Sequence, residues 1–280
     1  MAGMIAAPIA DARAQARTSQ ERTSQERASS APSNCRLDVT GTGRVRSVTD
    51  GRSFVLDDGR EVRLAGIEVP LAPAAGETGA RAEADLAAGR ASRAALAAIV
   101  SERMVELRQD GGARDRYGRM LAFVHGAGDS QSVAHQMLVR GFARVSAHVG
   151  DRACAAELWG RERAARDGKL GLWGEAYYAV RGADDLAGLT AEQGQFAVVE
   201  GRVSSVRESG GTIYLNFGRR WSQALTVTIS KRNERTFAAA GIEPKKLENR
   251  RIRVRGWVEE RNGPRIEATR AKQIKMAERN

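Results

Sequence analysis

Hydrophobic and polar residues alternate along residues 41–67 in three short runs. The runs are Val45–Val48, Ser53–Leu56 and Glu61–Ile67, and the pairs Asp50-Gly51 and Asp58-Gly59 separate them. Alternation with a period of two is typical of a half-buried strand, and Asp-Gly between two such runs is a hairpin signal. The pattern predicts a meander of antiparallel strands.

The spacing of apolar residues changes after residue 80. Residues 81–100 are rich in Ala and Leu at helical spacing. Shorter runs predict further strands at 104–107, 120–124 and 143–146, and further helices at 132–139 and 155–166. Many short strands with helices inserted and appended indicate a five-stranded, partly open barrel of the OB type with capping helices.

A second series of alternating runs begins near residue 195. It predicts strands, one short helix and two more strands, at 197–208, 212–218, 225–230, 232–240, 250–260 and 264–276. This is again the OB order of elements. We therefore predict a mainly β chain with helices (α+β), in which a first OB domain (35–178) and a second OB-like domain (195–276) are joined by a linker (179–194).

Residues 1–34 lack any such pattern. The first 16 are small and apolar and end in Ala14-Gln15-Ala16, the small-x-small pattern that signal peptidase reads, and the next 17 are polar and Ser-rich. We expect a signal-peptide remnant followed by a disordered linker, and hence a periplasmic or secreted protein. An ordinary disordered leader on a cytoplasmic protein is the alternative.

The two cysteines, Cys35 and Cys154, bear on the same question. An even number permits one disulfide, which would form in an oxidising compartment, whereas both would be free thiols in the cytosol. The signal-like leader favours the disulfide.

Charge is unevenly distributed along the 280 residues. The net charge is +11, and residues 196–280 alone contain 19 Lys and Arg against 9 Asp and Glu. A basic C-terminal half favours nucleic acid or another polyanion as the partner, although a solvated basic face is the alternative. No stretch approaches the roughly 20 apolar residues that span a bilayer, so we expect no membrane partner.

Four segments resemble the thermonuclease family, whose type member is staphylococcal nuclease. They are RLAGIEVP (63–70), RDRYGRMLAFV (114–124), GFARV (141–145) and GLW (171–173), and they follow the family's order within residues 41–174. The resemblance implies an OB barrel that hydrolyses phosphodiester bonds with the aid of calcium. It also implies two acidic metal ligands, a carboxylate that activates water, and two arginines on the phosphate.

The arginines of this set are kept. Arg63 in RLAGI and Arg119 in YGRM stand where the family places them, and Arg116 and Tyr117 match positions that line its nucleotide pocket. A planar guanidinium can bind a phosphate through two charge-assisted hydrogen bonds, which is the chemistry that this role requires. A surface ion pair is the alternative for an arginine on a barrel strand.

The carboxylates are mostly changed. The family's Asp-Gly-Asp-Thr turn is DGRS at 50–53, so Arg52 replaces the first metal ligand, and Leu71 replaces the water-activating glutamate. Glu68 keeps the second acid. At an effective dielectric constant near 20, each unit charge pair at about 4 Å is worth roughly 4 kcal/mol, so a dication beside Arg52 is disfavoured by several kcal/mol. We expect no cofactor, with Glu68 a weak calcium ligand if the protein is active.

These substitutions predict a protein that binds the nucleic-acid backbone with weakened or lost hydrolysis. Arg52 would take the place of the ion and form a phosphate clamp with Arg63 and Arg119. The alternatives are an active secreted nuclease of DNA or RNA that recruits another acid, such as Glu77, and an OB-type module that binds proteins. The sequence leaves open the preference for DNA or RNA and the oligomeric state.

Aromatic residues lie among arginines in the second domain. Tyr214, Phe217 and Trp257 alternate with polar residues as core residues would, so we expect them to be buried. Arg219, Arg220 and Trp221 fall in a turn-like segment and are the predicted nucleic-acid contacts there, because aromatic rings stack on unpaired bases while arginines bind phosphates.

Overall fold

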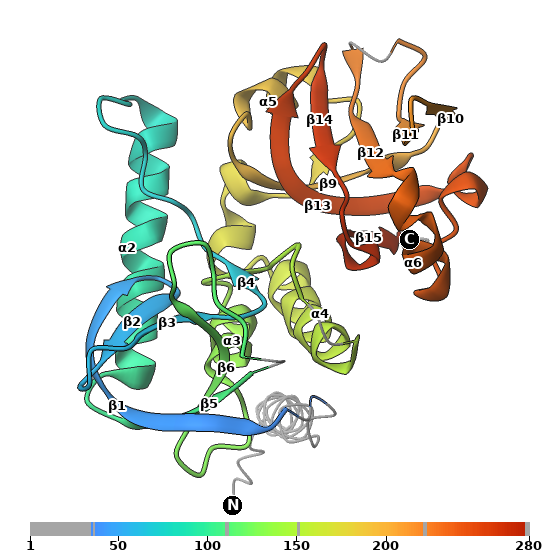
Figure 1. Ribbon diagram of the computed structural model, residues 1–280. Coiled ribbons are helices and arrows are strands. Elements are labelled where there is room, and N and C mark those ends of the chain that lie inside the picture. The colour runs from blue at the N-terminus through green and yellow to red at the C-terminus, as the bar shows by residue number, and fades with distance from the viewer. Residues whose placement is uncertain (1–34, 36, 110–111, 150–151, 221–222, 278–280) are drawn as a thin grey trace, which may run out of the picture. The chain divides into compact units, whose positions relative to one another are not determined.

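Five strands of the N-terminal half close into a barrel (Figure 1). Their order is β1-β2-β3-β6-β5, where β1 is Val39–Asp50, β2 Ser53–Leu56, β3 Glu61–Leu64, β6 Met120–Gly126 and β5 Met104–Arg108. The predicted OB-type fold is therefore confirmed, but the barrel is closed rather than partly open. Closure follows from the length of β1, because its first part pairs with β5 and its second part with β2.

The structure is a computed structural model that describes residues 35, 37–109, 112–149, 152–220 and 223–277. Residues 35–280 belong to one compact unit. The predicted signal-peptide remnant and disordered linker, residues 1–34, lie outside the described residues, as does Trp221. None of the described helices has the length and apolar character needed to cross a membrane.

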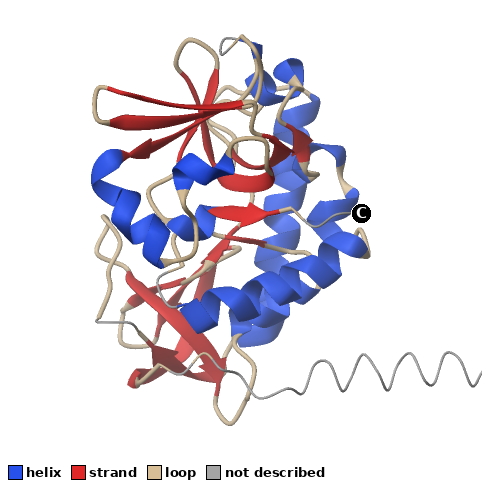
Figure 2. Ribbon diagram, turned by 90° about the vertical axis from the view of Figure 1, so that its right-hand side faces the viewer, coloured by secondary structure: helices blue, strands red, loops and turns tan. Residues whose placement is uncertain are grey.

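Three helices pack on the barrel and on one another (Figure 2). They are α2 (Ala80–Val100), α3 (Val133–Val139) and α4 (Arg152–Asp167), each within three residues of its predicted position. Alternate strand residues such as Leu56 and Leu107 point into the barrel, where Leu96 of α2 and Leu138 of α3 complete the core. The apolar residues that alternate along the strands and those at helical spacing on α2 thus pack into the same core.

One predicted strand is divided in a way that positions an acidic residue. The run 61–67 ends as β3 at Leu64, and β4 (Ile67–Glu68) pairs instead with β7 (Arg144–Val145) in a separate two-stranded sheet. Gly66 lies between them at φ +81°, in van der Waals contact range of the Leu158 side chain on α4. This bend carries Glu68 out of the barrel wall.

The predicted disulfide between Cys35 and Cys154 is confirmed. It joins the segment before β1 to α4, with a Cα–Cα distance of 4.3 Å across 119 residues of sequence. The bridge therefore fixes the start of the described chain to a helix of the same half.

A second, larger sheet forms from the C-terminal half. Its order is β10-β11-β12-β14-β13-β9-β8, and β15 adds to β13. The bounds are β8 Arg181–Gly182, β9 Phe196–Arg202, β10 Ser205–Ser209, β11 Thr212–Asn216, β12 Thr226–Ser230, β13 Arg251–Glu260, β14 Pro264–Glu267 and β15 Ile274–Met276. Among the described residues, the short helix α6 (Glu234–Ala239) follows β12, and 3-10 helices lie at Gly171–Gly174, Ala176–Tyr178, Lys231–Asn233, Pro244–Leu247 and Ala271–Gln273.

Both halves use the same series of strand pairings. Along β10-β11-β12-β14-β13-β9, the third pair is parallel and the other four are antiparallel. Around the first barrel, β1-β2-β3-β6-β5-β1, the third pair is likewise parallel and the other four are antiparallel. Only Val203 and Ser204 separate β9 from β10, so the two ends of this pairing series are consecutive in sequence. The single strand predicted at 197–208 is thus divided into β9 and β10, and a second OB-like barrel stays a prediction.

The segment 179–194, expected to be a linker, is folded. It contains β8 and α5 (Leu186–Ala191), and Asp185 caps this helix by accepting a hydrogen bond from the Gly188 N–H. Leu189 is buried in the core of the C-terminal half. The polar and Gly-containing sequence suggested a linker, but this one buried leucine and the helix cap are enough to anchor the segment.

Candidate nucleic-acid interface

A cleft of about 880 Å³ opens beside β3 and β4 on the N-terminal half. Its charged lining consists of four arginines and three acids, Arg52, Arg63, Arg116, Arg119, Asp50, Glu68 and Asp115. Tyr117 and Leu71 also line it. The structure therefore brings together in one cleft every site residue predicted for the first domain, apart from the disulfide cysteines.

Arg52 is buried against Glu68. The two side chains form an ion pair, and the residues are 6% and 5% exposed. The Asp50 carboxylate accepts a hydrogen bond from the Arg52 N–H at 2.8 Å and so closes the turn, and the Ser146 hydroxyl donates to Glu68 at 3.1 Å. Burial, with repulsion from Arg63, lowers the pKa of Arg52 to about 10, which leaves it charged at neutral pH.

Asp115 bridges the other two arginines. Its Oδ2 lies 2.7 Å from Arg119 Nη2 and 3.6 Å from Arg63 Nη1, and its Oδ1 accepts hydrogen bonds from the backbone N–H groups of Tyr117 and Arg119. Partial burial opposes ionisation of Asp115, but these hydrogen bonds hold its pKa below the ordinary value. Because Arg63 also lies 3.8 Å from Glu68, the cleft contains a continuous row of alternating charges, Arg52, Glu68, Arg63, Asp115 and Arg119.

An exposed aromatic ring stands at the cleft. Tyr117 is 67% exposed, and the guanidinium carbons of Arg116 and Arg119 lie 4.9 and 5.3 Å from its ring centroid. A planar ring between two cations can stack on a base whose phosphate the arginines bind.

Comparison with known families agrees with this geometry. Residues 61–175 match the model of the family described as staphylococcal nuclease homologue. This segment is a staphylococcal nuclease-like domain. The match contains Arg63, Glu68, Asp115 and Arg119, and it starts after Arg52. A comparison with curated proteins gave no match.

Several residues that line the cleft of the nuclease-like domain were not among the predicted site residues. They are Asp50, Asp115, Ser146, His148 and Trp257. Asp115 begins the Asp-x-Tyr-Gly-Arg motif, so the sequence did contain a signal for it. Trp257 lies on β13 of the C-terminal half and His148 follows β7. Tertiary folding alone brings these two to the cleft.

His148 adds no charge to the cleft at neutral pH. Burial, together with the nearby Arg270 and Arg63 guanidinium groups, lowers the pKa of this imidazole below its ordinary value. A histidine with a lowered pKa is neutral above about pH 6.5. The four arginines and three acids therefore set the net charge of the cleft lining at +1.

The donors in this cleft do not fit calcium. Calcium takes six to eight oxygen ligands, whereas Glu68 is already paired with Arg52. Leu71 lines the cleft, and the carboxylate of Glu77, an exposed residue, accepts a hydrogen bond from the Ala74 N–H at 2.9 Å outside the cleft lining. Across the described ranges, no three His, Cys, Asp or Glu side chains gather as a metal-binding group.

The predicted contacts of the second domain are only partly brought together. Arg219 and Arg220 are exposed, and Arg219 lines a pocket that is about 610 Å³ in volume and separate from the cleft. Of the three aromatic residues expected in the core, Phe217 is buried. Tyr214 and Trp257 are half-buried, so the prediction was wrong for these two. On β11 the core side belongs to Ile213 and Leu215, which places Tyr214 on the opposite face.

Proposed function

We propose that the nuclease-like domain binds the phosphodiester backbone of nucleic acid in the cleft, with calcium-dependent hydrolysis weakened or lost. The observation that carries this proposal is the buried ion pair of Arg52 and Glu68. It places a fixed guanidinium charge beside the one retained acid, where the family resemblance puts a metal ligand.

The row of arginines supports backbone binding. The side chains of Arg63 and Arg119 are each 20% exposed, so their outer N–H groups are accessible from the cleft. A phosphate oxygen can accept hydrogen bonds from both guanidinium groups, as carboxylates do in the protein itself. Arg52 is buried and neutralises Glu68, so that acid does not oppose a phosphate in the cleft, and Tyr117 offers a ring for stacking.

The missing base supports the loss of hydrolysis. Leu71 cannot take a proton from water, and a missing general base typically lowers the rate about 10²- to 10⁴-fold. Glu77 is held by its own loop rather than at the cleft. The alternative of an active nuclease that uses Glu77 therefore has no support from the geometry.

A digestion and binding assay tests the proposal. We expect the protein to bind a labelled DNA duplex equally in EDTA and in calcium, and to release no products in either. Replacing Arg63 and Arg119 by Ala should weaken binding at low salt and flatten the plot of log affinity against log salt by about one unit per lost phosphate contact.

The matched control removes two exposed arginines outside the cleft, Arg46→Ala with Arg90→Ala. It should leave the salt slope close to that of the native protein. Calcium-dependent products that Glu68→Ala abolishes would make the chain an active nuclease. Binding that does not weaken with salt would instead favour the protein-interaction module.

We also propose that the mature chain works in the periplasm or outside the cell. The Cys35–Cys154 disulfide supports this location, because such bridges persist in oxidising compartments and are rare in the cytosol.

A further inference from the structure

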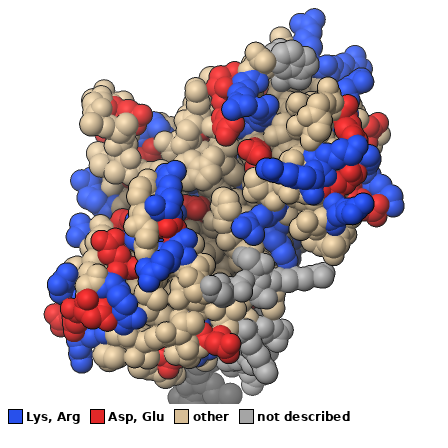
Figure 3. Space-filling model, in the orientation of Figure 1, with Lys and Arg blue, Asp and Glu red and all other residues tan. Residues whose placement is uncertain are grey.

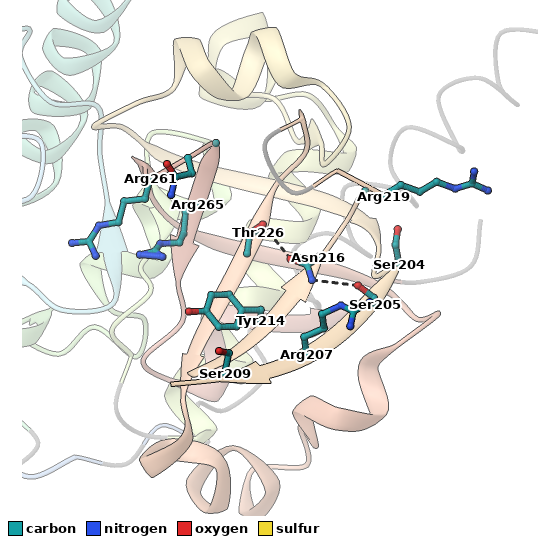
Figure 4. A pocket seen from close by; sticks show the side chains of 13 residues that line it. Ser204, Ser205, Arg207, Ser209, Tyr214, Asn216, Arg219, Thr226, Arg261 and Arg265 are labelled. Atoms are coloured by element: carbon teal, nitrogen blue, oxygen red, sulfur yellow. Dashed lines mark hydrogen bonds between the residues drawn. The ribbon is translucent and has the colours of Figure 1, made fainter. Parts of the chain in front are cut away.

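A second pocket lies on the face of the C-terminal sheet formed by β10, β11, β12 and β14 (Figure 4). Its volume is about 610 Å³, within the range of about 300 to 1,000 Å³ that small-molecule sites occupy. The charged part of its lining consists of Arg207, Arg219, Arg261 and Arg265, and no Asp or Glu is among the described residues that line it. We call it the sheet pocket.

The strand register places one aromatic ring among these arginines. Tyr214 on β11 is the cross-strand neighbour of Arg207 on β10, and Arg265 on β14 is the neighbour of Thr226 on β12. Figure 4 shows the Tyr214 ring between Arg207 on one side and Arg265 on the other. The ring also lines an adjoining cavity of about 450 Å³, so open space lies on more than one side of it.

Three of the four arginines of the sheet pocket make no ion pair with a described residue, unlike Arg52, Arg63 and Arg119 of the cleft. Within the described part of the chain, Arg207, Arg219 and Arg265 make no ion pair or side-chain hydrogen bond, and the Nε of Arg265 is buried without a partner. Arg261 has only a 3.9 Å contact with Glu259. The lining therefore carries a charge of +4, against +1 in the cleft.

This concentration of unpaired charge does not follow from the basic composition alone. Figure 3 shows acidic side chains mixed with the basic ones over the C-terminal half. Even the cavity adjoining the sheet pocket is lined by Glu259 and Glu267. An anion is thus favoured in the sheet pocket rather than in the adjoining cavity, and Arg265 lines both.

The polar floor of the pocket is fixed before any ligand binds. The Asn216 amide donates to the Ser205 hydroxyl at 3.2 Å and accepts from the Thr226 hydroxyl at 3.4 Å. The Asn216 amide nitrogen carries two N–H groups, so the second one can donate to a base edge. Among the described residues that line the pocket, Tyr214 is the one aromatic or aliphatic side chain, and the others are Ser, Thr, Asn, Gly and Arg.

We propose that the sheet pocket binds an unpaired nucleotide of single-stranded nucleic acid, with the base stacked on Tyr214 and the phosphates bound by Arg207 and Arg265. A base within a duplex is already stacked on its neighbours, so the pocket selects single strands. This site is independent of the function proposed for the cleft, because the two share no residue.

The test measures binding of a labelled oligothymidine and of a matched duplex to the full chain that carries Arg63→Ala and Arg119→Ala. In this background Tyr214→Ala should weaken single-strand binding roughly 5- to 150-fold, since stacking is worth about 1 to 3 kcal/mol per base. The salt slope should stay unchanged, because no charge is lost. Tyr214→Phe should bind within about twofold of its parent, since the ring is kept.

The arginines are tested by their salt dependence. Arg207→Ala with Arg265→Ala should lower the slope for the single strand by about 1.4, or roughly 0.7 for each phosphate contact. Arg232→Ala with Arg235→Ala removes the same charge from exposed positions outside the pocket and should leave the slope nearly unchanged. Tyr214→Trp provides a second readout, because stacking should quench the added fluorescence.

Three results would overturn the proposal. The first is an equal decrease of the salt slope in the two double-arginine variants. The second is an equal decrease of duplex and single-strand affinity in Tyr214→Ala. The third is displacement of the oligonucleotide by polyglutamate together with unchanged affinity in Tyr214→Ala. The last would indicate a binding surface for acidic proteins. If the variant with Arg63→Ala and Arg119→Ala binds duplex DNA as tightly as the native protein, the function proposed for the cleft is contradicted, whereas the sheet pocket can still be tested in that variant.

Discussion

Arg52 shows how one substitution changes the chemistry of a retained scaffold. Its neighbours still form the turn, because Asp50 accepts the Arg52 N–H as turn residues commonly do. Its guanidinium, however, pairs with the buried Glu68, whose other contacts are the Ser146 hydroxyl at 3.1 Å and Arg63 at 3.8 Å. Each of the two charges makes burial of the other tolerable, so they are expected to persist together.

This interpretation predicts that calcium binding can be introduced. In Arg52→Asp with Leu71→Glu, the repulsive charge is removed and two carboxylates join Glu68 at the cleft. We expect calorimetry to detect calcium binding and the variant to cleave DNA slowly in calcium, because Arg63 and Arg119 remain at the cleft.

Leu71→Glu alone is the control for this prediction. It adds the carboxylate but keeps Arg52, so it should neither bind calcium measurably nor cleave. If the double variant also fails to bind calcium, Arg52 is not what excludes the ion.

The elements were largely predictable because each carries its own periodicity. Strand β2 and helix α2 were found within one residue, since alternation and helical spacing are local properties, whereas β1 begins at Val39, six residues before the predicted run. The break between β3 and β4 was not found, because it depends on contact between Gly66 and Leu158, 92 positions away. The row of alternating charges in the cleft was predicted in part. The family motifs identified Arg63 and Arg119, but their ion pairs with Asp115 appear only in the folded structure.

The bend at Gly66 supplies a prediction at this scale. A Cβ at Gly66 would lie 2.5 Å from Leu158 Cδ1, and the backbone has φ +81°. Gly66→Ala should therefore lower the free energy of unfolding by about 1 to 2 kcal/mol through the left-handed backbone and by a further 1 to 3 kcal/mol through overpacking. Denaturant unfolding measures the sum.

Gly128→Ala separates the two causes. Gly128 has φ +83°, with no atom within 4 Å of an added Cβ, so only the backbone contribution of about 1 to 2 kcal/mol should appear. If Gly66→Ala and Gly128→Ala lower the free energy of unfolding equally, the Leu158 side chain moves aside without cost and does not fix the bend.

At the scale of the whole molecule, buried polar contacts connect the two halves. Arg255 on β13 donates to both carboxylate oxygens of Glu162 on α4 at 2.9 and 2.7 Å and to the Val145 carbonyl at 2.8 Å. Arg81 on α2 similarly reaches Glu192 at 3.1 Å. The partners are 93 and 111 residues apart in sequence, so no local pattern predicts them. These contacts join the two halves within residues 35–280, which form one compact unit.

The Glu162–Arg255 pair gives the last prediction. Burial disfavours the Glu162 carboxylate, but the charge and hydrogen bonds of Arg255 hold its pKa below the ordinary value. A folded pKa below the unfolded one stabilises the fold above about pH 4.3 and loses that contribution as the pH falls through the folded pKa. Glu162→Gln should cost about 3 to 5 kcal/mol at pH 7, because it leaves the Arg255 charge buried and unpaired.

The loss should shrink as the pH falls below about 4.3, because Glu162 is then protonated in the unfolded chain, and its stabilising contribution declines until the folded carboxyl is protonated too. Unfolding by denaturant from pH 3 to pH 8 measures both effects. Glu200→Gln, which alters a more exposed pair with Arg251 and Arg253, should cost much less. Glu162→Leu with Arg255→Met removes both charges and should recover most of the stability. A Glu162→Gln loss that is the same at pH 3 as at pH 7 would show that the carboxylate does not hold the halves together through its charge.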